Sequence, residues 1–212
     1  MPEPPRLRVA SEYDEGDHGT LTWVDDQNAK YLSIKDDGIT VEWDKEIKKR
    51  GGLRGWLATK RNPFYGTPPA WVPIATRARF HSGAFKWDFI VDEMQRAQIG
   101  VGFMLQWDQG LDWGFYGYLG AGQSAWSYDP STGDVVTQTK SIAGGLPKFA
   151  DGHGGVVSVR LELPRRDVGR GLFTVDGVES PPIILSEGAV VVPAACLLRK
   201  GQRVRLNGFT LE

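Results

Sequence analysis

The segment from Gly83 to Asp92 alternates large apolar side chains with polar ones at a period of two residues. Successive side chains of an extended strand point to opposite faces, so the apolar set lies on one face and the polar set on the other. Such a segment is typical of an antiparallel sheet with one face in a core and one in water. The apolar positions are Phe85, Trp87, Phe89 and Val91, and the polar positions are Lys86, Asp88 and Asp92.

Short segments with strand character recur along most of the chain, and Gly, Pro, Asn or Asp occupies most of the gaps between them. Asp36-Asp37-Gly38 predicts a hairpin, because Asp-Gly supplies the positive φ of a tight turn. One helical turn is expected, at Lys45–Arg50. Regularly spaced short strands predict an all-β fold, an antiparallel two-sheet β-sandwich. The expected strands are Thr20–Val24, Tyr31–Ile34, Ile39–Trp43, Ala75–Phe80, Phe85–Asp92, Ala97–Leu105, Ser124–Tyr128, Val135–Thr139, Val156–Leu163, Leu172–Asp176, Val190–Leu198 and Arg203–Leu211.

The size and charge of the chain fit a single soluble domain. We expect residues 1–19, which hold three prolines and an acidic stretch, to form a flexible leader, and residues 20–212 to form the sandwich. The net charge of −1 gives no reason to expect a nucleic acid or a membrane as partner. Because no apolar signal region opens the chain and no segment is long enough to span a bilayer, a cytoplasmic location is expected. The basic run from Lys45 to Arg61 is interpreted as a solvated surface rather than a phosphate-binding patch.

Residue types that build disulfides and metal sites are scarce in this sequence. Cys196 is the single cysteine, so an internal disulfide is impossible, and its apolar neighbours predict a small core residue. His18, His81 and His153 stand in no metal-binding spacing. We therefore expect neither a metal nor a cofactor.

The segment from Trp107 to Tyr118 is the strongest candidate for a binding function on residue types alone. It combines large rings with glycines and shows no strand alternation, which predicts a loop that carries rings. Rigid rings give a large contact area at a small entropic cost, so they commonly anchor interfaces. The alternative is that the rings fold back over the sandwich as a lid. Trp87, Trp126 and Tyr128 are expected in the core.

Short motifs, each loose by itself, follow one another in a fixed order along the chain. They are Tyr31–Val41, Ser82–Asp88, Ile99–Gly102, Ser124–Asp129 with Gly133, Gly154–Leu163, Phe173–Gly177 and Val192–Ala194. In this order they resemble the sequence of SPRY domains, and the resemblance covers most of the chain from Leu21 to Leu211. Two departures are His153 and Glu162, which stand where the family usually has Asp.

The resemblance implies a bent antiparallel β-sandwich of the concanavalin A-like jelly-roll type. It also implies a non-catalytic module that binds a short peptide segment or a protein surface through loops at one rim. In peptide-binding members the pocket is built from three parts of the chain, the last of which often carries a Trp where this chain has leucine. With the aromatic segment included, the predicted partner-binding residues are Tyr65, Pro68, Pro69 and Trp71, then Trp107, Trp113, Phe115, Tyr116 and Tyr118, then Leu197 and Leu198.

The sequence leaves two other classes of function open. A carbohydrate-binding or glycan-cleaving protein on the related lectin-like fold would explain the tryptophans, but the paired acids of the glucanases, in the pattern Glu-x-Asp-x-x-Glu, do not occur. Asp108 and Asp112 are interpreted as solvated loop acids. A structural protein that hides the aromatic loop against a second copy is the other class, although a monomer is expected. The favoured hypothesis is a non-enzymatic module with a protein or peptide partner.

Overall fold

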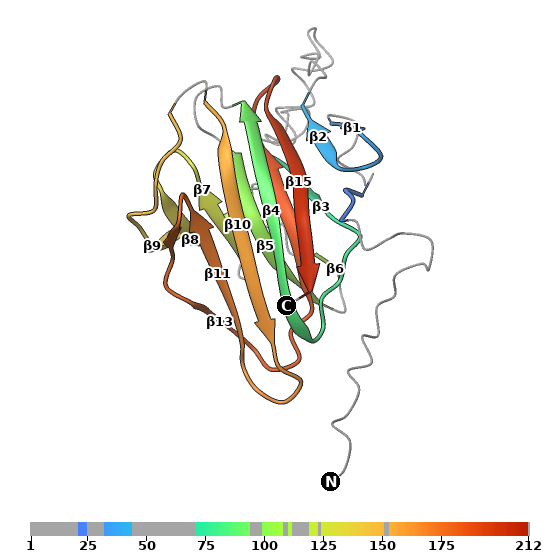
Figure 1. Ribbon diagram of the computed structural model, residues 1–212, viewed down its shortest axis with the longest axis vertical. Coiled ribbons are helices and arrows are strands. Elements are labelled where there is room, and N and C mark those ends of the chain that lie inside the picture. Colours follow the sequence, from blue (N-terminus) through green and yellow to red (C-terminus); the bar gives the residue numbers. More distant parts are fainter. Residues whose placement is uncertain are drawn as a thin grey trace, which may run out of the picture.

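The computed structural model describes residues 21–24, 32–43, 71–93, 99–107, 110–111, 119–122, 124–150 and 153–211. Within these residues the chain forms two antiparallel sheets that lie face to face (Figure 1). The all-β sandwich predicted from the alternation is therefore confirmed. The expected leader, residues 1–19, and the expected helical turn at residues 45–50 lie outside the described residues.

The first sheet contains eight of the described strands. They run in the order β1-β2-β15-β4-β10-β11-β12, and β13 also pairs with β11. The strands are β1 (Ser33–Lys35), β2 (Thr40–Glu42), β4 (Gly83–Glu93), β10 (Gly155–Leu163), β11 (Gly169–Val175), β12 (Val178–Glu179), β13 (Ile183–Leu185) and β15 (Arg203–Leu211).

The second sheet contains seven strands within the same part of the chain. Their order is β3-β14-β5-β7-β8-β9, and β6 pairs with β5. The strands are β3 (Val72–Ala75), β5 (Ile99–Trp107), β6 (Gly110–Leu111), β7 (Ala125–Asp129), β8 (Asp134–Thr137), β9 (Lys140–Ala143) and β14 (Val191–Leu197), and a single 3-10 turn, η1 (Leu119–Ala121), precedes β7.

The core between the sheets follows the period-two pattern of β4 and its neighbours. Trp87 and Phe89 are fully buried, and β10 places Val159 and Val157 directly opposite them. Phe173 of β11 continues this apolar face and is also fully buried. Because the alternation and the pairing agree, one register buries the inward-facing apolar side chains of these strands.

Strand β14 is buried on both of its faces, unlike the half-buried strands of the first sheet. Val191, Ala195 and Leu197 belong to the core between the sheets. The intervening side chains belong to a second cluster on the outer face of the second sheet, which we call the outer cluster. Its buried members are Ala75, Met104, Leu119, Ala125, Val192, Ala194 and Cys196, and the partly buried Trp71 packs against it.

Several local predictions can be compared with the structure. The hairpin at Asp36-Asp37-Gly38 is confirmed, with φ values of 54°, 54° and 90°. The strand expected at Ala75–Phe80 lies earlier, as β3, and the residues after it form only isolated bridges, at Thr76 and Phe80. Trp87 and Tyr128 are buried as expected, whereas Trp126 is partly exposed because its side chain packs at the edge of the core. No helix in the described ranges is long and apolar enough to cross a membrane.

Candidate functional site

The starts of β3 and β5 and the end of β14 lie at one corner of the second sheet, and this corner gathers parts of the chain that are far apart in sequence. Leu197, the last residue of β14, pairs with Val72 of β3 on one side and with Ile99 of β5 on the other. The residue before β3 is Trp71 and the residue after β14 is Leu198, so the pairing places these two side by side. We call the surface formed by Trp71 and Leu198, together with the buried Leu119 beneath it, the β14 corner.

The turn η1 forms the base of the β14 corner. Leu119 is fully buried, and its backbone N–H donates to Cys196 Sγ at 3.4 Å. Leu119 and Trp71 both pack on the outer cluster. The end of the predicted aromatic segment, which directly precedes Leu119, is thereby fixed against β14.

The turn between β8 and β9 holds η1 in position. The N–H of Thr139 donates to the Gly120 carbonyl at 2.9 Å, and the N–H of Gln138 donates to the Gly122 carbonyl at 3.4 Å. Both turn residues have positive φ, 49° for Gln138 and 60° for Thr139. A β-branched residue such as Thr rarely adopts this conformation, so the hydrogen bonds to Gly120 of η1 and to Gly122 after it help to offset the strain of the turn.

The turn that follows β14 is rigid because a buried amide organises its backbone. Gln202 is fully buried, and its Oε1 accepts the N–H groups of Leu198 at 2.7 Å and Arg199 at 2.9 Å. The N–H of Gly201 also donates to the Trp43 carbonyl at 2.8 Å. The position of Leu198 at the β14 corner is therefore fixed by hydrogen bonds rather than by its own packing alone.

The predicted binding residues separate into three groups. Tyr65, Pro68, Pro69, Trp113, Phe115, Tyr116 and Tyr118 lie outside the described residues.

Within the described part, Trp71 and Leu198 come together and both are partly exposed. Leu197 does not share this surface, because its side chain is fully buried in the core between the sheets. Trp107 lies at the opposite end of the nine-residue strand β5 from Ile99, about 26 Å along the strand. The structure thus brings one residue from each of two predicted parts to the corner and leaves Trp107 away from it.

Two ionisable side chains of the second sheet, Cys196 and Tyr128, are kept in their neutral forms by burial. Burial raises the pKa of the Cys196 thiol to about 12, although N–H donation from Leu119 opposes the shift. Burial likewise raises the pKa of Tyr128, whose hydroxyl donates to the Pro147 carbonyl. A protonated and fully buried thiol is a poor nucleophile. Cys196 therefore acts as the small apolar residue that the sequence predicted.

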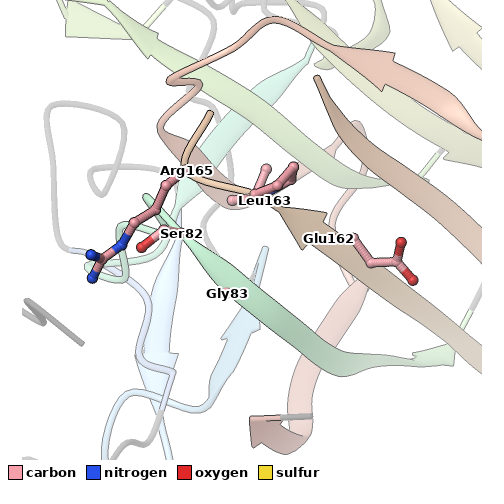
Figure 2. Close-up of a pocket in the computed structure, with 6 residues that line it drawn as sticks. Ser82, Gly83, Glu162, Leu163 and Arg165 are labelled. Carbon is pink, nitrogen blue, oxygen red and sulfur yellow. The ribbon is translucent and has the colours of Figure 1, made fainter. Parts of the chain in front are cut away.

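A shallow depression of about 280 Å³ lies at the other end of the sandwich, where β4 begins and β10 ends. Its lining includes Ser82, Glu162, Leu163 and Arg165. Figure 2 shows the Arg165 side chain running past Ser82, whereas the Glu162 carboxylate points away on the other side of Leu163. Glu162 instead lies 3.3 Å from the guanidinium of Arg160. Because its charged groups diverge, the depression offers no pair of groups aimed at one substrate atom.

A metal-binding cluster is also missing from the described ranges, which contain no group of three or more His, Cys, Asp or Glu side chains arranged to hold an ion.

No family model matches the chain, and no curated protein matches it in sequence. Its fold is nevertheless similar to that of the TRIM65 PSpry domain, with a TM-score of 0.56 and 11% identity over 89% of this chain and 92% of that chain. The SPRY domain of human HERC1 gives a TM-score of 0.50 and 14% identity over 82% and 91% of the two chains. Stonustoxin gives 0.52 and 17% over 89% of this chain and 28% of its own. The resemblance predicted from the motifs is confirmed at the level of fold.

Proposed function

From its SPRY-type fold, we propose that the chain is a protein-interaction module that binds a short extended segment of a partner protein at the β14 corner. The observation that supports this most directly is the convergence of the predicted loops. Trp71 precedes β3, Leu119 follows the aromatic segment, and Leu198 follows β14, yet all three meet over one end of the second sheet. A surface made from two sequence-distant segments, with a third segment fixed beneath it, suits the recognition of another chain.

The chemistry of the corner favours an apolar anchor on the partner. Trp71 offers a partly exposed ring that packs on the outer cluster, and Leu198 offers a partly exposed aliphatic side chain. Large rings on a rigid support lose little conformational entropy when a partner binds. The buried Gln202 amide lowers that cost further, because the turn at Leu198 is already ordered. We propose that a large apolar side chain of the partner packs between Trp71 and Leu198.

Peptides selected from a random displayed library against the immobilised full chain provide the test. Trp71→Ala and Leu198→Asp should each weaken the selected peptides by at least about tenfold, which is the loss typical of a central anchor. Ile184→Ala is the matched control, since Ile184 is 58% exposed on β13 of the other sheet and its loss should leave affinity unchanged. Melting temperatures of all variants would separate a binding defect from a folding defect.

The predicted rings of the aromatic segment can be tested in the same assay. Tyr116→Ala should weaken the selected peptides while leaving the melting temperature close to that of the wild type. Equal affinity of wild type, Trp71→Ala and Leu198→Asp, or failure of the library to enrich any sequence, would contradict the proposal.

A further inference from the structure

A basic strip follows β3 along the edge of the second sheet. In residues 77–81 the side chains alternate, so that Ala78 and Phe80 are buried while the other three point outward. Phe80 exchanges two backbone hydrogen bonds with Val191 of β14, which fixes this segment as an extended edge. The outward residues, which we call the basic strip, are Arg77, Arg79 and His81.

The two arginines of the basic strip have no counter-charge among the described residues. No described carboxylate forms an ion pair with either of them. Arg79 is partly buried, and its Nη1 donates to the carbonyls of Thr76 at 2.7 Å and Ala78 at 2.9 Å. Burial without a negative partner lowers the pKa of Arg79. An anion would stabilise the Arg79 guanidinium, which is held in place and partly desolvated but has no ion-pair partner among the described residues.

The chain enters the sandwich directly beside this strip. Val24 N–H donates to the Ala75 carbonyl at 2.9 Å, and Arg77 N–H donates to the Thr22 carbonyl at 3.0 Å. Trp23 bridges to Thr76 in the antiparallel sense. In an antiparallel pair, the direction from Trp23 back toward Leu21 is the direction from Arg77 toward His81. The described chain from Trp23 to Leu21 therefore runs in the direction of the strip.

We propose that the basic strip binds the acidic stretch of this same chain at residues 12–17, which lies outside the described residues. The stretch contains four carboxylates in six residues. Asp17 is four residues from Leu21 and can reach about 13 Å from it, which equals the extended length from Arg77 to His81. The acidic residues are Glu12, Asp14, Glu15 and Asp17.

Tethering makes this contact effective although each ion pair is weak. A single exposed pair contributes little and is screened by salt. The acidic stretch is attached only a few residues from the strip, however, so its effective concentration there is in the millimolar range. The strip is consequently occupied at low ionic strength and vacated at high ionic strength. An acidic segment of another protein would have to displace residues 12–17 before it could bind.

Zero-length cross-linking gives a direct test in the full chain. Arg77→Lys with Arg79→Lys keeps both charges and supplies amines that a carbodiimide can join to nearby carboxylates. Peptide mass spectrometry should find cross-links from positions 77 and 79 to residues 12–17 at least about fivefold more often than from Arg170→Lys, an exposed position on β11. At about 1 M salt, where the screening length is about 3 Å, the excess should disappear. Equal yields at the two sites would overturn the proposal.

Proteolysis provides a second test that does not depend on new amines. A glutamate-specific protease should cut after Glu12 and Glu15 at least about threefold faster in Arg77→Gln with Arg79→Gln than in the wild type at low salt. The charge-matched control, Lys86→Gln with Arg170→Gln, should be cut at the wild-type rate. Unchanged cleavage in the strip variant, together with binding of a free oligoglutamate peptide to the wild-type strip, would overturn the proposal and assign the strip to an acidic partner.

Discussion

Modification of the Cys196 thiol by a soluble reagent should be about a thousandfold slower in the folded chain than in the unfolded chain at pH 8. The ordinary pKa of 9.0 leaves roughly one thiol in ten ionised at that pH, whereas a pKa of about 12 leaves roughly one in ten thousand. Only the thiolate reacts, so the pKa alone accounts for this factor. Complete burial beneath η1 slows the reaction further.

A chromogenic aromatic disulfide reports the reaction by absorbance, because the chain has a single cysteine. The rate would be measured in native buffer and again in denaturant. The matched control moves the thiol to an exposed turn, as Cys196→Ser with Ser186→Cys, and this variant should react almost as fast folded as unfolded. Native labelling of Cys196 should therefore proceed only through opening of η1 or through global unfolding.

This rate also tests the base of the β14 corner. A peptide that binds Trp71 and Leu198 stabilises the closed arrangement over Cys196, so it should slow labelling in proportion to its occupancy. A native rate within about tenfold of the unfolded rate would refute the reasoning. It would mean that Leu119 does not cover the thiol and that the corner lacks the fixed base described here.

Three further predictions follow from contacts of the described residues. Raising the pH from about 8 to about 10 should lower the free energy of unfolding by about 1.4 kcal/mol more in the wild type than in Cys196→Ala. The cause is that the unfolded thiol ionises near pH 9.0, whereas the folded thiol keeps its proton up to about pH 12. Denaturant titrations at both pH values measure the two free energies. Gly102→Ala should cost about 3 kcal/mol, because its Cβ would lie 2.1 Å from the Trp126 carbonyl oxygen and force β5 from β7, and an unchanged melting temperature would contradict this. Ser180→Ala should cost about 1–3 kcal/mol, since the hydroxyl that accepts the buried Phe173 N–H at 3.0 Å is lost, while Ser180→Thr should restore most of the stability.

The long strands of the first sheet were predictable because one face of each lies in water. In β4 and β10 the alternation of the sequence is also the alternation of burial, so side-chain order gives both the strand and its inward face. The short strands at the edges carry no such pattern. Strands β12 and β13 flank Ser180-Pro181-Pro182, and their pairing with β11 rather than any local alternation defines them.

The orientation of the corner residues could not be predicted from the sequence. Residues 194–198 are all apolar, so no alternation indicates that Leu197 faces the core while Leu198 faces outward. A shift of β14 by one residue would exchange these faces, and only its pairing with β3 and β5 fixes the register. Trp107 belongs to the predicted set because aromatic residues crowd the segment that follows it. Ring content does not indicate that Trp107 lies at the end of β5 away from the corner. The motif resemblance places Trp71 and Leu198 in one predicted site, and the register of β3 with β14 puts the two residues next to each other.

The β14 corner and the basic strip lie on one continuous segment of the chain, at residues 71–81, with β3 near its start. All four residues of β3 are buried, and Arg79 lies eight residues beyond Trp71, about 26 Å along an extended chain. At that separation the corner lies well beyond the screening length in physiological salt, so the charges of the basic strip do not act on a peptide bound there. Arg79→Gln should therefore release the acidic stretch without changing the affinity of a corner-binding peptide, and Trp71→Ala should do the reverse. If peptide affinity and leader cleavage changed together in both variants, β3 would have to transmit a shift between its ends, and the two surfaces would be one coupled site.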